Sequence, residues 1–220
     1  MKKYYEAYEE RYKQIHQEGL SWSPNNPTLI VEEIIIKYHL ENGKILEIGC
    51  GEGRDARNLL EKEYSLEAID NSHEAISYCQ EKDPNHKDSY KVVDIIKEKE
   101  KQEEYSFIYS VACLHMFVLE EDRKSFYQYI YNHLEKDGYS LILSMGDGIE
   151  EKISDISKAF DIVKRTHQES KKEVNIVATS CRIMNMEHLK KEAEENHFEI
   201  IESGITFTNN HFNQIIYLVV

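Results

Sequence analysis

Residues 44–54 read Lys-Ile-Leu-Glu-Ile-Gly-Cys-Gly-Glu-Gly-Arg, and they carry the strongest evidence for the fold. An apolar segment runs into three glycines at alternate positions, Gly49, Gly51 and Gly53, and the acidic residue Glu47 lies just before them. Because glycine has no Cβ, it permits a tight turn, a positive φ and close approach of the backbone to a ligand. A strand that ends in such a loop before a helix is typical of a nucleotide-type pocket at the carboxyl edge of an α/β sheet.

The dinucleotide-binding fingerprint Gly-x-Gly-x-x-Gly is one alternative for this loop, and the residues do not fit it. If Gly49 and Gly51 are the first two glycines, the third position falls on Arg54. Glu52 would also place a negative charge beside a pyrophosphate, a group that binds the positive end of a helix. A glycine-rich turn without a ligand is the other alternative, and the strand before the loop argues against it.

The segment 47–53, Glu-Ile-Gly-Cys-Gly-Glu-Gly, resembles motif I of class I S-adenosylmethionine (SAM)-dependent methyltransferases, (Asp/Glu)-x-Gly-x-Gly-x-Gly. The resemblance implies SAM as the cofactor and S-adenosylhomocysteine as its product. It places Glu47 under the amino-acid end of SAM, where an acidic group suits the ammonium. Arg54 is a candidate partner for the SAM carboxylate, for Glu47 or for Asp55. The loop residues expected to contact SAM are Gly49, Cys50, Gly51 and Gly53.

Strand-like and helix-like segments alternate from residue 44 to about residue 146, which indicates parallel βαβ units. Strands are predicted at residues 44–48, 65–69, 90–93, 106–111 and 139–144. Helices are predicted at 54–63, at 72–82 with Ser72 as the N-cap, and at 121–135 with its stop near Gly138. Strand-like segments at 198–208 and 214–220 predict a closing hairpin.

The fold class is therefore α/β. The resemblance implies a Rossmann-like class I methyltransferase fold: a mostly parallel seven-stranded sheet with an antiparallel last strand and helices on both faces. The length suits a single domain over residues 1–220. Residues 1–40 are predicted to form an N-terminal helical cap, which either packs against the sheet or closes over the cofactor. Residues 146–184 are predicted to be an insertion on the acceptor side, where members of this family usually have one.

Acidic residues follow the second and third predicted strands. Asp70 lies about 20 residues after Gly51, which is the spacing at which an acid meets a ribose in nucleotide-binding folds. Its carboxylate can accept hydrogen bonds from both ribose hydroxyls, and Asn71 is a neighbouring contact. The resemblance implies that Asp94 accepts from the adenine amino group while Ile95 lies against the ring. Solvated acids that cap the next helix are the alternative.

Residues 110–116, Ser-Val-Ala-Cys-Leu-His-Met, resemble motif IV of the same family and place Ala112 near the transferable methyl group. His115 by its position, and Asp147 after the fifth strand, are candidate catalytic residues, with His167 as a weaker candidate base. The segment lacks the Asn-Pro-Pro-Tyr or Asp-Pro-Pro-Tyr signature of amino-directed DNA, RNA and glutamine methyltransferases. This absence argues against those substrates.

Trp22, the only tryptophan, lies in the N-terminal arm. In the tellurite-resistance and thiopurine branches of the family, an N-terminal segment with an aromatic residue folds over SAM and helps to form the acceptor site. The arm is loosely similar to that segment, which makes Trp22 a candidate cofactor contact. Filling of a gap between helices is an equal alternative, because large aromatic side chains mostly serve packing.

Composition excludes several classes of function. A net charge of −14 argues against broad binding to nucleic acid and against anionic membranes. No apolar run approaches the roughly 20 residues of a spanning helix, and the first residues lack the apolar core of a signal peptide. The four cysteines show no pairing pattern, so we expect free thiols and a cytoplasmic protein. The ten histidines show no metal-binding spacing, so no metal is expected.

These observations predict SAM-dependent methyl transfer to a small-molecule acceptor by in-line displacement, in a monomer or a homodimer. Three alternatives stay open. One is methylation of tRNA, rRNA or a protein side chain, which would need a basic or aromatic groove. Another is aminopropyl transfer from decarboxylated SAM. The third is a SAM-binding module without turnover.

Overall fold

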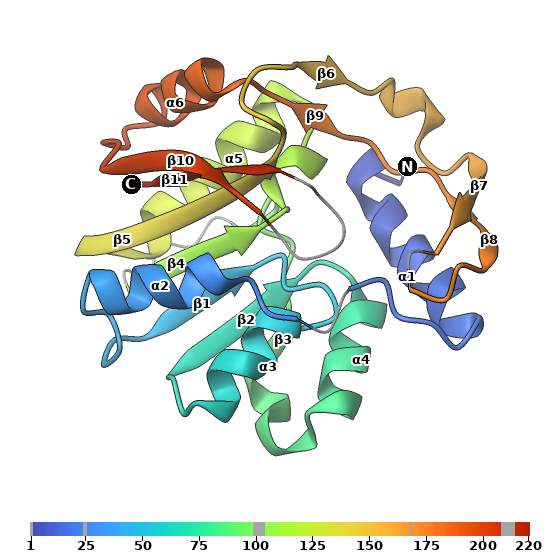
Figure 1. Ribbon diagram of the computed structural model, residues 1–220, viewed down its shortest axis with the longest axis horizontal. Helices are drawn as coiled ribbons and strands as arrows, with labels where there is room; N and C mark the ends of the chain where they lie inside the picture. Colours follow the sequence, from blue (N-terminus) through green and yellow to red (C-terminus); the bar gives the residue numbers. More distant parts are fainter. Residues whose placement is uncertain (1, 24–25, 99–103, 168, 208–213) are drawn as a thin grey trace.

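A central sheet of seven strands organises the molecule (Figure 1). The computed structural model describes residues 2–23, 26–98, 104–167, 169–207 and 214–220. The strands of this sheet are β1 (Ile45–Ile48), β2 (Leu66–Asp70), β3 (Tyr90–Val92), β4 (Tyr105–Val111), β5 (Leu134–Met145), β10 (Glu202–Thr206) and β11 (Ile215–Val219). Their order is β10-β11-β5-β4-β1-β2-β3, and β11 runs antiparallel to both of its neighbours. The expected Rossmann-like sheet with an antiparallel last strand is confirmed.

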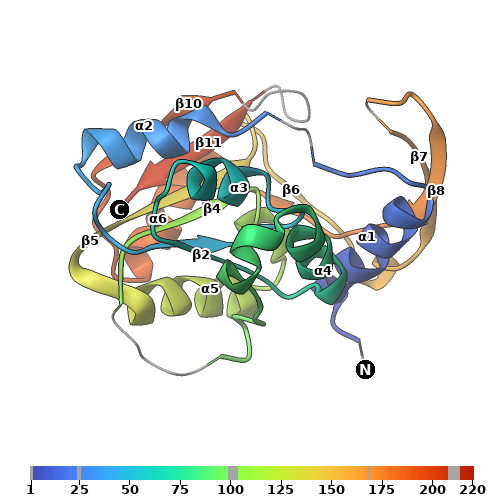
Figure 2. The same cartoon turned by 90° about the horizontal axis from the view of Figure 1, so that it is seen from below.

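Helices cover both faces of the sheet, as Figure 2 shows. The helices α2 (Leu29–Lys37), α3 (Arg54–Glu61) and α4 (His73–Lys82) pack on one face, and α5 (Glu120–His133) and α6 (Met186–Glu195) pack on the other. Alternate residues of β1 enter the two cores, Ile45 on the α2 side and Leu46 on the α5 side. A parallel sheet that is buried on both faces needs such continuous apolar strands.

Register and capping match the local sequence signals. Ile45 pairs with Leu66 of β2 and with Phe107 of β4, so the carboxyl ends of these strands meet at one edge. Ser72 accepts a hydrogen bond from the backbone nitrogen of Ala75 at 3.0 Å, which confirms the predicted N-cap of α4.

The predicted end of the helix at 121–135 near Gly138 is wrong. The helix α5 ends at His133, and β5 begins at Leu134, which pairs with Tyr105 of β4. Gly138 lies inside the strand, where an added Cβ would stand 3.0 Å from the carbonyl oxygen of Ser106. Pairing with a distant strand therefore overrides the helical pattern at this point.

A separate layer lies at the carboxyl edge of the sheet, and we call it the cap. It consists of α1 (Ala7–Gln17) and the antiparallel pair β7 (Ile162–Thr166) and β8 (Glu173–Val177), which lie side by side in Figures 1 and 2. Ile15, Val174 and Ile176 form its small core, with Trp22 packed against them. The two N-terminal helices therefore lie in different parts of the molecule: α1 belongs to the cap, and α2 packs on the sheet.

The remaining elements are short. The pair β6 (Lys152–Ile153) and β9 (Arg182–Ile183) joins the cap to the sheet region. The 3₁₀ turns are η1 (Tyr4–Glu6), η2 (Pro84–Ser89), η3 (Leu114–Met116) and η4 (Ile156–Lys158). The closing hairpin is present as β10 and β11, and residues 208–213 of the predicted hairpin lie outside the described residues. No helix in the described part of the chain is long and apolar enough to cross a membrane.

Candidate active site

The glycine loop joins β1 to α3 in the conformation that the sequence predicts. Gly49, Gly51 and Gly53 have φ values of +72°, +53° and +72°. A Cβ on Gly49 would lie 2.6 Å from Sγ of Cys113, and one on Gly51 would lie 2.6 Å from Oη of Tyr12. Both the backbone conformation and the close neighbours therefore require glycine in this loop.

Glu47 is buried at the end of β1, with 2% of its surface exposed. Its Oε2 atom is buried and has no hydrogen-bond partner among the residues that the structure describes. Burial, followed by the nearby charge of Asp55, raises the pKa of Glu47 well above its usual range. A cation bound next to this oxygen would stabilise the carboxylate, which is the chemistry expected for the SAM ammonium.

Asp70 lies at the end of β2 and holds the glycine loop. Its two carboxylate oxygens accept hydrogen bonds from the backbone nitrogens of Gly51 and Ser72, each at 2.9 Å. A carboxylate oxygen has two lone pairs, so each oxygen retains one for a ligand hydroxyl. Burial raises the pKa of Asp70, and the two backbone donors oppose that shift.

A small cavity of about 40 Å³ lies beside Asp70. Asn71, Asp94 and Ile95 line it together with Asp70, so the structure brings these four predicted cofactor contacts together. Asp94 also pairs with Lys97 at 2.6 Å and accepts a hydrogen bond from the backbone nitrogen of Ile96 at 3.1 Å in the turn that follows β3. Tyr12 of α1 reaches into the same cavity, so the cap contacts the ends of β2 and β3.

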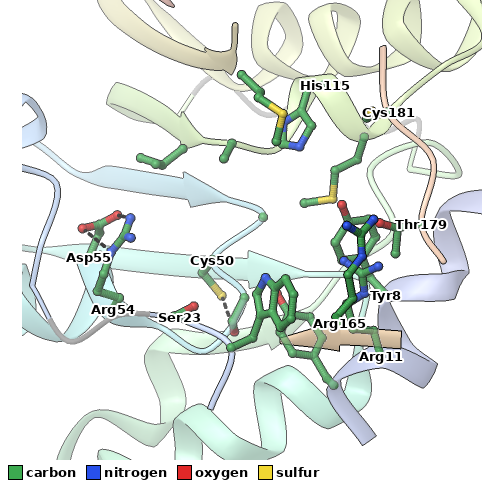
Figure 3. A pocket seen from close by; sticks show the side chains of 18 of the residues that line it. Tyr8, Arg11, Ser23, Cys50, Arg54, Asp55, His115, Arg165, Thr179 and Cys181 are labelled. Atoms are coloured by element: carbon green, nitrogen blue, oxygen red, sulfur yellow. Dashed lines mark hydrogen bonds and ion pairs between the residues drawn. The ribbon is translucent and has the colours of Figure 1, made fainter. Parts of the chain in front are cut away.

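A larger cavity of about 480 Å³ opens on the other side of the glycine loop (Figure 3). The two cavities share Tyr8, Tyr12, Gly49 and Met116 as lining residues, so they adjoin. Seven further predicted contacts line the larger cavity: Glu47, Cys50, Gly51, Arg54, Ala112, His115 and Trp22. Gly53, the last glycine of the loop, lines neither cavity and is the N-cap residue of α3.

Arg54 is engaged by its neighbours. Its Nη2 atom lies 2.5 Å from Oδ2 of Asp55 and 2.6 Å from Oγ1 of Thr28. Asp55 in turn accepts from the backbone nitrogen of Thr28 at 2.6 Å. Of the three partners proposed for Arg54 from the sequence, this structure shows Asp55.

The candidate bases occupy different environments. His115 lines the larger cavity, and burial together with the positive charge of Arg123 lowers its pKa to about 4. His167 lines it too, with Nε2 2.7 Å from the Ser21 carbonyl and Nδ1 2.9 Å from Oγ of Ser170. A histidine with a pKa near 4 is neutral at pH 7 and is a weak base.

Asp147 follows β5 and lies outside the group of residues that line the larger cavity. Its Oδ1 accepts from the backbone nitrogens of Ile149 and Glu150 at 2.8 Å, and these bonds lower its pKa.

Ala112 has a φ of +53°, which is unusual for a residue with a side chain. Such strain clusters at functional sites, and Ala112 lines the cavity.

Glu52 has a structural role that we missed from the sequence. It is 1% exposed and accepts hydrogen bonds from the backbone nitrogens of Trp22 at 2.8 Å and Ser23 at 2.6 Å. His16 lies between Glu52 and Glu74, with ring nitrogens 2.9 and 2.7 Å from their carboxylates. The charge that argues against a pyrophosphate thus anchors the N-terminal arm to the loop.

Arg11 of α1 is a second residue that we missed. Its guanidinium lies over the rings of Trp22 and Tyr8, with distances to their centroids of 4.9 and 5.5 Å. Residues three apart are neighbours on a helix surface, so the spacing of Arg11 from Tyr8 is the signal that could have found it.

Within the residues that the structure covers, no group of three or more acidic, histidine or cysteine side chains could hold a metal ion. All four cysteines are free thiols.

Comparison with known proteins identifies the central part of the chain. Residues 45–138 match the family model described as a methyltransferase domain. No curated protein matches the chain.

Solved structures share the fold over most of the chain. The 1,6-didemethyltoxoflavin-N1-methyltransferase of Burkholderia thailandensis, with bound 1,6-didemethyltoxoflavin and S-adenosylhomocysteine, is 13% identical, with a TM-score of 0.70. That match covers 94% of this chain and 83% of the other. The CcbJ methyltransferase of Streptomyces caelestis is 15% identical, with a TM-score of 0.68 and coverage of 97% and 96%. A SAM-dependent methyltransferase of Clostridium acetobutylicum is 16% identical, with a TM-score of 0.65 and coverage of 94% and 95%.

Proposed function

We propose that the chain is a class I SAM-dependent methyltransferase and that it transfers the methyl group of SAM to a small-molecule acceptor held in the larger cavity. The observation that carries this proposal is the place of that cavity, since residues of both the glycine loop and the cap line it. A volume of about 480 Å³ lies between the glycine loop and the cap, within the usual size range of small-molecule sites.

The residues of the site fit SAM. The buried Oε2 of Glu47, without a hydrogen-bond partner among the described residues, suits the ammonium, and Gly49 and Gly51 line the cavity with backbone that a ligand can approach closely. Asp70 has lone pairs left for the ribose, and Asp94 and Ile95 lie in the adjoining cavity for the adenine. We propose Cys50, Gly49, Gly51, Gly53, Arg54, Asn71, Ala112 and Trp22 as further residues of the cofactor site.

SAM supplies a methyl group that its sulfonium already activates. The chain then has to hold the acceptor in line with the S–CH₃ bond and exclude water. Positioning of this kind contributes roughly 7–11 kcal/mol in favourable cases. With its pKa near 4, His115 does not supply a strong base at pH 7. This favours acceptors whose nucleophilic atom carries a free lone pair without help, and it leaves His115, which lines the cavity, as a candidate for positioning.

The cap supports a small acceptor over RNA or a protein side chain. Residues of α1 and β7 line the cavity together with those of the glycine loop, and the chain as a whole carries a charge of −14. The Burkholderia neighbour holds a small molecule together with S-adenosylhomocysteine, which agrees with this proposal. We propose that residues 1–220 act as one unit, as a monomer or a homodimer in the cytoplasm.

The test has two stages. Calorimetry with SAM and S-adenosylhomocysteine should show binding, and no heat at high micromolar ligand would contradict the cofactor site. A product screen over thiols, amines, phenols and metalloid oxyanions should then yield S-adenosylhomocysteine. Turnover with tRNA or a protein alone would refute the small-molecule acceptor. Binding without turnover on any acceptor would point to a SAM-binding module.

A further inference from the structure

Arg11 brings a buried positive charge to the larger cavity. The residue is 7% exposed, and its Nε and Nη2 atoms donate to the Val177 carbonyl at 3.3 and 2.9 Å. Among the described residues no carboxylate forms an ion pair with this guanidinium, and both printed hydrogen bonds go to a neutral carbonyl. A buried cation without an anion is costly, because the desolvation of the charge is not offset.

Two further cations line the same cavity, Arg165 of β7 and Lys152 of β6. The charge of Arg165 acts on Arg11 strongly enough to lower its pKa, in addition to the larger lowering by burial. Within the described part of the chain, neither Arg165 nor Lys152 forms an ion pair. Three positive side chains therefore converge on one cavity of a chain whose net charge is −14.

The acidic groups of the cavity lie on its other side. Figure 3 shows Arg54 and Asp55 at one side, and Arg11, Arg165, Tyr8 and Thr179 grouped at the other. The carboxylate of Asp55 is paired with Arg54, and Glu47 lies at the end of β1. The cavity is therefore polarised, with a cation-binding end at the glycine loop and an anion-binding end at the cap.

We propose that the methyl acceptor carries a carboxylate or a comparable oxyanion, and that Arg11 and Arg165 bind it at the cap end of the cavity. This inference rests on the proposed function. A guanidinium presents paired N–H donors that match the two oxygens of a carboxylate. Binding of the anion would compensate the buried charge of Arg11 and would orient the nucleophilic atom of the acceptor toward the glycine loop.

The test compares matched acids and amides on the protein saturated with S-adenosylhomocysteine. The pairs are 2-mercaptobenzoate with 2-mercaptobenzamide, 3-hydroxybenzoate with 3-hydroxybenzamide, and glycine with glycinamide, each titrated by calorimetry. We expect an acid to bind at least about tenfold more tightly than its amide, the scale of a charged hydrogen bond. Equal binding, or no binding, across all three pairs overturns the proposal.

Variants assign the preference to the two arginines. Arg165→Gln, at an exposed position, and Arg11→Gln should each remove most of the preference for the acid. Lys164→Gln is the matched control, because Lys164 is the neighbouring exposed cation, pairs with Glu173 and does not line the cavity. Circular dichroism verifies that Arg11→Gln is folded. Preference for the acid that survives in both arginine variants also overturns the proposal.

SAM and the proposed acceptor each carry a carboxylate. The affinity of the variants for S-adenosylhomocysteine shows which of these two carboxylates the arginines bind. We expect this affinity to change less than twofold in Arg165→Gln. A tenfold loss, with the preference for the acid intact, would assign the guanidinium to the cofactor. If the acids bind through the arginines but no acceptor yields S-adenosylhomocysteine from SAM, the proposed function fails while the anion site stands.

Discussion

The glycine-loop edge of the sheet and the cap form opposite walls of one cavity, and they are built in different ways. The loop edge comes from the ends of neighbouring strands, and its contacts are largely backbone atoms, such as those of Gly51 and Ser72 with Asp70. The cap joins side chains of the N-terminal helix to a hairpin far along the chain, as in the bond of Arg11 to Val177. A cavity surface made largely of backbone atoms suits a cofactor that does not vary, and a surface made of side chains suits recognition of one particular acceptor.

Gly51→Val tests the loop wall and should have the largest effect. The added side chain would meet Oη of Tyr12 and occupy the ligand space, at a φ of +53°. We expect calorimetry to show no binding of S-adenosylhomocysteine. Gly19→Val is the control, since Gly19 has a φ of +68° but no atom within 4 Å of its added Cβ. Binding by Gly51→Val at the affinity of the parent protein would show that the cofactor lies elsewhere.

Asp70→Ala should weaken binding of S-adenosylhomocysteine by about 1.5–3 kcal/mol, the scale of a charged hydrogen bond. The carboxylate both holds the loop at Gly51 and keeps lone pairs for the ribose. Asp88→Ala, at an exposed position in η2, should leave the affinity unchanged. Equal affinities of the two variants would remove Asp70 from the site.

Glu52→Ala tests the link between the two walls. The change leaves the backbone nitrogens of Trp22 and Ser23 without their acceptor. We expect hydrogen exchange to show about tenfold lower protection at these two amides. Glu61→Ala, at an exposed position of α3, should not alter them. Unchanged protection in Glu52→Ala would mean that other contacts hold the arm.

The pH dependence of the arm should be the smallest effect. Burial by itself lowers the pKa of His16, but hydrogen bonds with Glu52 and Glu74 raise it overall. The stabilisation from protonated His16 is therefore complete below its ordinary pKa and is lost as the pH rises through the raised value. Trp22 is the only tryptophan, so its fluorescence should shift to the red over that range. A shift that persists unchanged in His16→Gln would exclude this histidine as the cause.

Local patterns were sufficient for most of the fold. The five predicted strands of the parallel sheet lie where β1 to β5 are found, and Ser72 caps α4 as expected. The failure at Gly138 has a physical cause, because the segment from Leu134 extends β5 by pairing with β4. Such pairing depends on a partner that is distant in sequence, and a helical pattern within one segment does not contain it.

Most of the candidate site could also be predicted from the sequence, as most of the fold could. The loop and the acids at the strand ends could be located because parallel strands end at one edge, and spacing alone places these residues. Glu52 and Arg11 could not be assigned in this way, since their roles depend on contacts with Trp22, Ser23 and Val177. For Asp147 the sequence predicted a place in the site from its position after β5, but its side chain does not line the cavity.

The order of residues alone determines the α/β class, the glycine loop and the acids beside that loop. These features depend on backbone conformation and on the ends of strands that follow one another along the chain. The polarity of the larger cavity follows from folding. It depends on α1 and β7–β8 packing together around Ile15, Val174 and Ile176, which brings Arg11 and Arg165 to one wall. Charges so far apart along the chain meet at one cavity only when the elements that carry them pack together.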